Sequence, residues 1–343
     1  KNKATITIDS SVFDKTGNTT NDDNSNFRGQ NAVVLGIEGS QTSIKNSNIT
    51  SNSIGSNAVF ATGEGSVINV ENTNIHTKGD SSRGLDATYK GTVNGKNLTI
   101  TTEGAHAATL ATDRGEGTIT AEAAKLTTSG TGSPVIYSTG NITANNVNGV
   151  ANKSEIGVVE GKNSITLTNS NVTGYHDNGF MLYQSFSGDA ESGIARLKAE
   201  NNTLTTHGTG AFIYVNNTTA EADLTGNTIL MPNTTTLVKA AADSRWGKDG
   251  ENGGHLTLRA SNQELSGNIV ADSISTIALD MTNGSSLVGA INTDNTAKEV
   301  TVKLSKDSTW TLTGDSYVKS LTNEDTTGEN IHLNGYKLVV ADK

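Results

Sequence analysis

Cysteine is absent from this 343-residue chain, proline occurs only twice, and aromatic residues make up 4% of the sequence. The lack of cysteine excludes a cysteine nucleophile, although it does not decide the cellular compartment. The hydrophobic fraction of 33% is also low, because globular chains average roughly 45–50% on a count that includes glycine. No apolar run approaches the ~18 residues of a membrane-spanning helix. The composition therefore argues against both a thick single core and a transmembrane segment.

Positive charge is scarce as well, with 25 Lys and Arg against 35 Asp and Glu and a formal net charge of −10. The basic residues form no cluster that could neutralise phosphates, so nucleic acid is not an expected partner. The start of the chain leads directly into a strand pattern, Ala4-Thr5-Ile6-Thr7-Ile8, rather than into the apolar core of a signal peptide. We therefore expect any export signal or anchor to lie outside this sequence.

A short phrase recurs along the chain: an Asn, two further residues that are mostly small and polar, and an aliphatic residue. Clear copies are Asn46-Ser47-Asn48-Ile49, Asn72-Thr73-Asn74-Ile75, Asn97-Leu98-Thr99-Ile100, Asn169-Ser170-Asn171-Val172 and Asn201-Asn202-Thr203-Leu204. Looser copies centre on Leu126, Val147, Ile229, Leu265, Leu287 and Leu312. The aliphatic residues are spaced too regularly for a disordered chain and indicate a thin, repetitive core.

Two further short strands are expected between successive copies of the phrase. One resembles Ala58-Val59-Phe60-Ala61-Thr62, the other follows the next glycine as in Gly65-Ser66-Val67-Ile68-Asn69-Val70, and Gly, Asn and Asp mark the corners. Three strands in about 25 residues predict an all-β fold, a right-handed parallel β-helix with one triangular coil per repeat.

The repeat divides the chain into three regions. Residues 1–30 are expected to hold a first strand, a loop from Asp9 to Gln30 and a cap, residues 31–286 the β-helix, and residues 287–343 its last coils and C-terminal cap. Two intervals exceed the coil length by about seven and about eleven residues, which places insertions near 184–193 and 241–253. Such loops often build binding sites on a solenoid, but they are also tolerated without a function.

Coils of this length with Asn at one corner resemble the pectate-lyase-like group of β-helices. The segments Ser308-Thr309-Trp310-Thr311-Leu312-Thr313-Gly314-Asp315 and Leu333-Asn334-Gly335-Tyr336-Lys337-Leu338-Val339-Val340 resemble the end of the passenger domain of autotransporter adhesins. The resemblance implies a protein exported to the surface of a bacterium. It does not imply one activity, because this fold carries lyases, hydrolases, adhesins and phage spikes.

A polysaccharide lyase of this fold would need carboxylates converging on Ca²⁺ and a neighbouring Arg or Lys. Asp86, Asp113, Arg114, Glu116 and Glu160 are the candidates. The run from Asp113 to Gly117 fits equally well as a charged turn between two strands, which is the interpretation that we favour.

Other catalytic sets are missing from the sequence. The Asn-x-Asp, Asp-Asp and Gly-His-Gly motifs of polygalacturonases are represented only by Asn292-Thr293-Asp294 and by Asp22-Asp23, which lie far apart along the chain. The six histidines are scattered without metal-ligand spacing, and there is no P-loop or Gly-x-Ser-x-Gly motif. We therefore predict no catalytic residues, no metal site and no cofactor.

The second strand of the central coils carries a set of residues suited to binding sugars. Counting with the first insertion removed puts Tyr137, Glu160, Tyr183, Tyr214 and Lys239 at one position of successive coils, ~4.8 Å apart. Outward tyrosines beside a carboxylate would offer rings for stacking and polar groups for sugar hydroxyls. A register shifted by one residue would instead turn them inward and put Phe180, Phe212 and Ile213 on the surface.

The inserted loops add Phe186, Arg245 and Trp246 to this face. The predicted ligand-binding residues are Tyr137, Glu160, Tyr183, Phe186, Tyr214, Lys239, Arg245 and Trp246. A second face, with outward Thr and Asn pairs, is interrupted by His76 and Lys125, so we interpret it as an ordinary solvated sheet.

The sequence thus predicts a secreted or surface-displayed bacterial adhesin or binding protein, which recognises a glycan of a host or neighbouring cell, or a matrix protein, through one face of a β-helix. Two alternatives stay open. One is a polysaccharide lyase or glycoside hydrolase that uses Glu160, Asp189 and Glu191 as carboxylates. The other is a stalk without a ligand.

Overall fold

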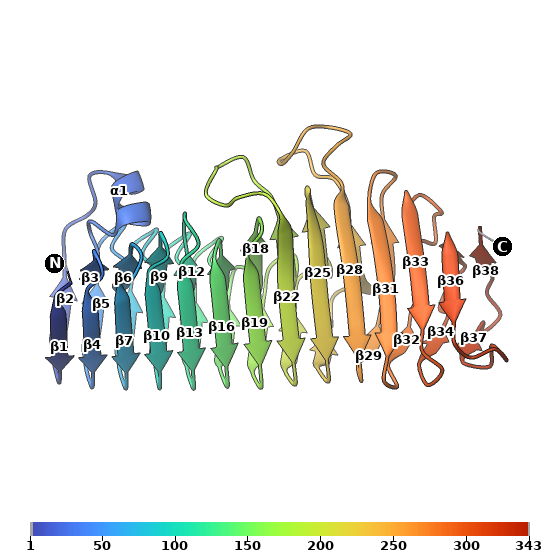
Figure 1. Cartoon of the computed structure of the whole chain (residues 1–343), viewed down its shortest axis with the longest axis horizontal. Helices are drawn as coiled ribbons and strands as arrows, with labels where there is room; N and C mark the ends of the chain where they lie inside the picture. Colours follow the sequence, from blue (N-terminus) through green and yellow to red (C-terminus); the bar gives the residue numbers. More distant parts are fainter. Residues whose placement is uncertain (1–2, 342–343) are drawn as a thin grey trace.

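The chain winds into a parallel β-helix, as a computed structural model that describes residues 3–341 shows (Figure 1). Each strand of the three long sheets pairs in parallel with a strand of the preceding or the following coil, and the coils take up about 25 residues each. The all-β class and the three-strand coil predicted from the repeat are therefore confirmed. No helix within residues 3–341 has the length and the apolar character needed to cross a membrane.

The longest sheet, which we call sheet A, has thirteen strands. Its strands are β1 (Thr5–Asp9), β4 (Gln41–Lys45), β7 (Val67–Glu71), β10 (Thr92–Lys96), β13 (Thr118–Glu122), β16 (Asn141–Asn145), β19 (Ser164–Thr168), β22 (Ile194–Glu200), β25 (Thr218–Thr225), β28 (Gly254–Ser261), β31 (Thr276–Thr282), β33 (Glu299–Leu304) and β36 (Ser320–Asn323).

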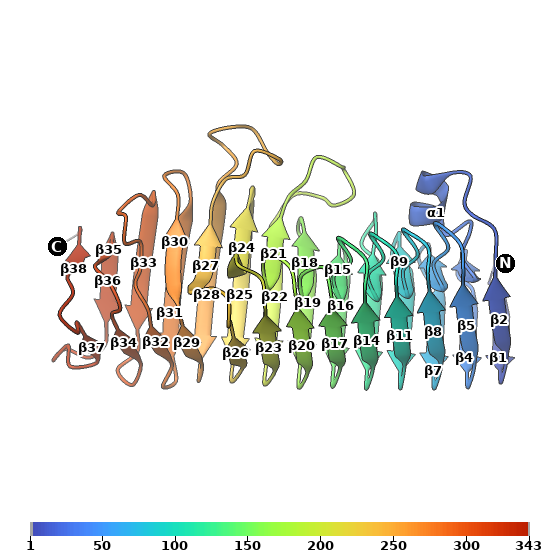
Figure 2. The same ribbon diagram turned by 180° about the vertical axis from the view of Figure 1, so that it is seen from behind.

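Sheet B, visible from behind in Figure 2, has nine strands. They are β2 (Val12–Lys15), β5 (Asn48–Ser51), β8 (Asn74–Thr77), β11 (Thr99–Thr102), β14 (Lys125–Thr128), β17 (Asn148–Ala151), β20 (Asn171–Gly174), β23 (Thr203–Thr206) and β26 (Thr228–Leu230). The last coils carry a four-stranded sheet of β29 (Glu264–Ser266), β32 (Ser286–Val288), β34 (Thr309–Thr311) and β37 (Ile331–His332).

Sheet C has ten strands and carries the site described below. They are β3 (Val34–Ile37), β6 (Val59–Thr62), β9 (Leu85–Thr88), β12 (Leu110–Thr112), β15 (Ile136–Ser138), β18 (Gly157–Glu160), β21 (Phe180–Tyr183), β24 (Ala211–Asn216), β27 (Thr236–Ala240) and β30 (Asn268–Ala271). A final pair consists of β35 (Ser316–Val318) and β38 (Leu338–Val340).

The corner between sheets A and B depends on one left-handed residue per coil. Asn46, Asn72 and Asn97 have φ angles of 49°, 50° and 53° there, a region that Asn tolerates better than most residues. Their side chains form a ladder, in which Asn72 Nδ2 donates to Asn46 Oδ1 over 3.3 Å and Asn97 Nδ2 to Asn72 Oδ1 over 3.1 Å. The recurring Asn of the sequence thus both turns the chain and links the coils.

The core is a stack of inward aliphatic side chains. Ile49 lies next to Ile75 in the register of sheet B, and both are buried. Two of the looser copies of the phrase are out of register by two residues, although Val147 and Leu312 are themselves buried in the core. Gly149, not Val147, aligns with Val172, and Trp310, not Leu312, aligns with Leu287. The looser copies of the phrase misled the count, because residues two apart on a strand point to the same side.

The N-terminal segment is more ordered than the expected loop from Asp9 to Gln30. It forms β2, which pairs with β5, and the short helix α1 (Asp22–Arg28). The Asn21 side chain accepts a hydrogen bond from the Asn24 amide, and Gly29 ends the helix with a φ of 63°, as expected for a capped helix.

Three features project from the same long edge of the solenoid (Figures 1 and 2). They are α1, the connection 184–193 between β21 and β22, and the connection 241–253 between β27 and β28. These two connections coincide with the insertions that the spacing of the repeats predicted. Together they border the outer face of sheet C.

Candidate functional site

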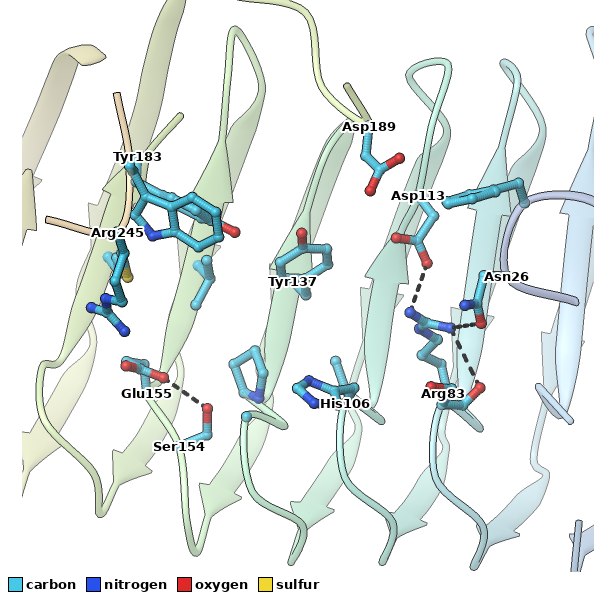
Figure 3. Close-up of a pocket in the computed structure, with 18 residues that line it drawn as sticks. Asn26, Arg83, His106, Asp113, Tyr137, Ser154, Glu155, Tyr183, Asp189 and Arg245 are labelled. Atoms are coloured by element: carbon cyan, nitrogen blue, oxygen red, sulfur yellow. Dashed lines mark hydrogen bonds and ion pairs between the residues drawn. The ribbon is translucent and has the colours of Figure 1, made fainter. Parts of the chain in front are cut away.

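A groove with a volume of about 490 Å³ runs over the outer face of sheet C, between α1 at one end and the two long loops at the other (Figure 3). We call it the sheet C groove. It is lined by Asn26, Phe27, Ser81, Arg83, His106, Ala108, Asp113, Gly132, Pro134, Tyr137, Ser154, Glu155, Val158, Met181, Tyr183, Asp189, Arg245 and Trp246. Its size lies within the ~300–1,000 Å³ of typical ligand pockets.

Helix α1 closes the N-terminal end of the groove through three contacts with sheet C and its turns. Arg83 Nη1 donates to Asn26 Oδ1 over 2.7 Å, and Thr88 Oγ1 donates to the Phe27 carbonyl over 2.9 Å. The Arg114 guanidinium stacks over the Phe27 ring, with Cζ 3.8 Å from the ring centre. These contacts hold α1 against coils that lie about 60 to 90 residues further along the chain.

Three charged side chains are buried beside α1. Arg83 Nη2 lies 3.2 Å from Asp113 Oδ2, and Asp86 lies beside them with no exposed surface. Neither carboxylate oxygen of Asp86 has a hydrogen-bond partner. Burial, and then the neighbouring charge of Asp113, raise the pKa of Asp86 well above its usual value, against the opposing effect of Arg83. Burial also raises the pKa of Asp113, so this cluster tends to hold a proton.

Glu160 is the centre of a buried hydroxyl cluster under the first long loop. Its Oε2 accepts hydrogen bonds from Tyr137 Oη over 2.7 Å and from Tyr183 Oη over 3.0 Å. Its Oε1 accepts from the hydroxyl of Ser185, and from that of Ser187 over 3.3 Å. Burial raises the pKa of both tyrosines, so the phenols stay protonated and donate to the carboxylate.

The first long loop is also fixed by an ion pair. Arg114 donates from Nη2 to Asp189 Oδ1 over 2.6 Å and from Nε over 3.1 Å. Because Arg114 also stacks on Phe27, one side chain joins α1 to the loop 184–193 along the rim of the groove.

The second long loop places Trp246 at the other end of the groove. The Trp246 ring lies 5.6 Å from Tyr183 and 6.5 Å from Phe186, in tilted arrangements. Arg245 donates from Nε and Nη2 to the Asp243 carboxylate, each over 3.1 Å. These hydrogen bonds lower the pKa of Asp243, so the pair stays ionised.

The tyrosines of the predicted binding face do point away from the core. Phe180 and Phe212 point inward and pack edge to face with ring centres 5.7 Å apart, so the alternative register is excluded. The single column of the prediction is nevertheless wrong. Tyr137 aligns with Val158, while Glu160 aligns with Tyr183 two residues further along the strands. The shift arises because the coil from Tyr137 to Val158 has 21 residues and is therefore shorter than the coil that would align Tyr137 with Glu160.

The predicted binding residues fall into three groups. Tyr137, Tyr183, Arg245 and Trp246 line the groove. Glu160 lies beneath it, and Phe186 is 69% exposed on the loop outside it. Tyr214 aligns with Lys239 on sheet C next to the groove, and the Lys239 ammonium lies 5.5 Å from the Tyr214 ring centre.

Several lining residues were missed by the sequence analysis. Asn26 and Phe27 belong to α1, whose Asn21-Asp22-Asp23 start is a recognisable helix-capping signal. Arg83 and Glu155 lie in turns that look like ordinary polar connections. Only the packing of α1 and the loops over sheet C makes them part of a site.

The carboxylates named for the enzyme hypothesis are distributed unevenly. Asp113 and Asp189 line the groove, Glu160 lies under it, and Glu191 pairs with Lys162 over 2.6 Å on the outside. Asp113 and Arg114, which we favoured as a simple charged turn, thus contribute to the groove and its rim. No group of three or more His, Cys, Asp or Glu side chains within residues 3–341 is placed to hold a metal ion.

Comparisons of the chain with protein-family models, with curated proteins and with solved structures found no match. The function therefore has to be argued from the groove itself.

Proposed function

We propose that this β-helix is a carbohydrate-binding protein of a bacterial surface, an adhesin that binds a glycan in the sheet C groove. The observation that supports this function is the groove, in which Phe27, Tyr137, Tyr183 and Trp246 lie among convergent polar side chains. Aromatic rings provide flat apolar faces for sugar rings, while polar groups at their edges bond hydroxyls. Display at the surface, secretion and an autotransporter-like origin are part of this proposal and rest on the resemblance of the sequence.

The shape of the groove supports a chain-like ligand. It extends from the coil of Arg83 to the loop that carries Trp246, over several coils spaced ~4.8 Å apart. Its ends are formed by separate elements, α1 and the long loops. An oligosaccharide lying along the solenoid axis would contact both ends, whereas a single sugar would contact one.

A glycan array tests this proposal. The wild-type protein is expected to bind a restricted set of oligosaccharides, and Trp246→Ala is expected to weaken binding by about tenfold or more, the loss of one buried aromatic contact. Tyr336→Ala removes an exposed aromatic residue at the C-terminal end of the solenoid, away from the groove, and serves as the control. Equal binding by all three proteins would overturn the proposal that the groove is the glycan site.

A polysaccharide-cleaving enzyme is the second candidate, and one observation favours it. Asp113 lines the groove, and burial raises its pKa, as required of a general acid that protonates a leaving group. Release of reducing or unsaturated ends from uronate or neutral polysaccharides, lost in Asp113→Asn, would establish this function. If the protein neither binds nor cleaves any polysaccharide, the stalk without a ligand becomes the better hypothesis.

A further inference from the structure

The positive charges around the sheet C groove are already neutralised within the protein. Three arginines lie at the groove or on its rim, and each forms an ion pair with one aspartate. The pairs are Arg83 with Asp113 at 3.2 Å, Arg114 with Asp189 at 2.6 Å, and Arg245 with Asp243 at 3.1 Å. An anionic ligand would have to compete with these carboxylates for each arginine.

Acidic groups in the same region exceed the basic ones. Three carboxylates, Asp113, Glu155 and Asp189, line the groove with only two arginines, Arg83 and Arg245. Glu155 has no Lys, Arg or His within ion-pair distance in the part of the chain that the structure describes. Glu160 is bonded by hydroxyl groups, whereas Glu155 accepts a single hydrogen bond, from Ser154 over 2.7 Å, and lines the groove. The groove is therefore acidic in net terms, and a further carboxylate in it would be repelled.

One carboxylate oxygen of Asp113 is free to accept hydrogen bonds at this acidic surface. Its Oδ2 is buried and forms the ion pair with Arg83, whereas its Oδ1 accepts no hydrogen bond from any residue that the structure describes. In Figure 3 its carboxylate points into the space between Asp189 and Tyr137.

The aromatic residues of the groove add to this preference. Tyr137 lies on β15, between the coils that carry Asp113 and Glu155. Ring faces attract cations, most strongly where water is excluded, and carboxylates beside aromatic rings are a common setting for ammonium recognition. Acidic and aromatic groups together match a ligand with positively charged amino groups.

We propose that the ligand of the sheet C groove is an oligosaccharide of amino sugars with free amino groups, which Asp113 and Glu155 bind at positions two coils apart. The inference rests on the proposed glycan binding and narrows its ligand. Two coils correspond to roughly 10 Å along the solenoid axis. Asp113 follows the end of β12 and Glu155 precedes the start of β18, so the two residues also lie at opposite ends of their strands. The two carboxylates would therefore bind different sugars of one chain. N-acetylation removes the charge of the amine, and uronates carry the opposite charge.

Calorimetric titration at neutral pH tests the charge preference. The probes are a pentamer of β-1,4-linked glucosamine, its fully N-acetylated counterpart and a galacturonate oligomer of equal length. We expect the glucosamine pentamer to bind at least about tenfold more tightly than the acetylated one, the value of one charge-assisted hydrogen bond. The galacturonate oligomer is expected not to bind.

Two isosteric variants locate the amino groups. Glu155→Gln is expected to weaken binding of the glucosamine pentamer by about tenfold, and Asp113→Asn is expected to act in the same direction. Glu191→Gln, outside the groove, is the matched control and should leave binding unchanged. Should Asp113→Asn fail to fold because Arg83 loses its partner, the partly exposed Glu155 decides the outcome.

The outcomes separate this inference from the proposed function. Tighter binding of the acetylated or the uronate oligomer, with loss of that binding in Trp246→Ala, would overturn the amino-sugar inference and leave glycan binding in place. An unchanged affinity in Glu155→Gln would also overturn it. If no oligosaccharide binds, both proposals are wrong.

Discussion

Single residues in the left-handed region control the corners of this solenoid. At the corner between sheets A and B, Ala123 occupies the position that Asn97 and Asn146 hold in the neighbouring coils, with a φ of 53° in all three. Alanine in this conformation costs roughly 1 kcal/mol or more, and it also interrupts the Asn ladder. Ala123 is therefore a weak point of an otherwise regular corner.

Replacing this alanine should stabilise the protein. We expect Ala123→Asn to raise the free energy of unfolding by about 1 kcal/mol, because asparagine tolerates the left-handed conformation better. Asn97→Ala should lower it by a similar amount. Urea denaturation measures both, and a destabilised Ala123→Asn would show that the corner residue is not under this strain.

The buried carboxyl of Asp86 makes stability depend on pH. Burial raises its pKa in the folded chain well above the ordinary value of 3.8. The folded chain therefore keeps a proton that the unfolded chain has released, and the stability gained from this proton falls as the pH rises from about 3.8 through the raised pKa.

Asp86→Asn should remove this part of the pH dependence. We expect the substituted chain to be at least as stable as the wild type at neutral pH, because a buried amide requires neither a bound proton nor a buried charge. The measurement is urea denaturation at a series of pH values, with the exposed Asp294→Asn as the control. A variant with the same decline in stability as the wild type would contradict this role of Asp86.

At the scale of the elements, the loop 184–193 is fixed from below and from the side. Glu160 accepts hydrogen bonds from the hydroxyl groups of Ser185 and Ser187, and Arg114 forms an ion pair with Asp189. A loop with several buried polar contacts to the sheet is pre-ordered, which reduces the entropy that a ligand must overcome on binding. The loop is therefore a wall of the groove even without a ligand.

Glu160→Gln should make the loop 184–193 more mobile. The amide retains one acceptor oxygen, so it cannot accept the hydrogen bonds of all four hydroxyl groups. Each lost hydrogen bond to a buried charged group costs about 1.5–3 kcal/mol. We expect faster amide hydrogen exchange in residues 184–193 and unchanged exchange in sheet B. Glu155→Gln is the matched control, and unchanged exchange in the loop would contradict the role of Glu160 as its anchor.

The elements differ in how far the sequence could predict them. The repeat identifies the strands and the two long loops because each coil buries the same few aliphatic positions. Alignment across the loosely repeated coils was wrong, since Gly149 has no side chain to mark the core position. Helix α1 was missed because six of its seven residues are polar and Phe27 alone makes no helical hydrophobic pattern, so only its capping residues mark it.

At the scale of the whole molecule, the solenoid brings together residues that are distant in the sequence. Phe27, Asp113, Asp189 and Trp246 border one groove, although more than 200 residues separate the first from the last. Phe27, Asp189 and Trp246 lie in segments that depart from the regular coil, whereas Asp113 lies in the turn after β12. The regular repeat thus supplies a flat sheet, and the departures from it form the site, so the sequence predicts the loops without predicting that α1 completes the enclosure.

The register along the axis is supported by alternating charges on sheet A. Lys198, Asp223, Arg259, Asp280 and Lys303 occupy one position of five successive coils, and Arg259 Nη1 lies 3.1 Å from Asp223 Oδ1. If each strand were paired with the strand two coils away, like charges would lie next to each other. The Arg259 and Asp223 side chains are about half exposed, so each pair of this kind adds little free energy, but the alternation avoids like-charge contacts in the coils that carry the two loops.

The measurement that tests the central claim most directly compares the same substitution on two faces of the solenoid. Met181→Arg places a long side chain on the floor of the sheet C groove, whereas Thr127→Arg places one on the outer face of sheet B. With any oligosaccharide that the wild type binds, we predict that Met181→Arg abolishes binding and that Thr127→Arg leaves the affinity unchanged. Full binding by a folded Met181→Arg protein would contradict the claim that the sheet C groove is the site.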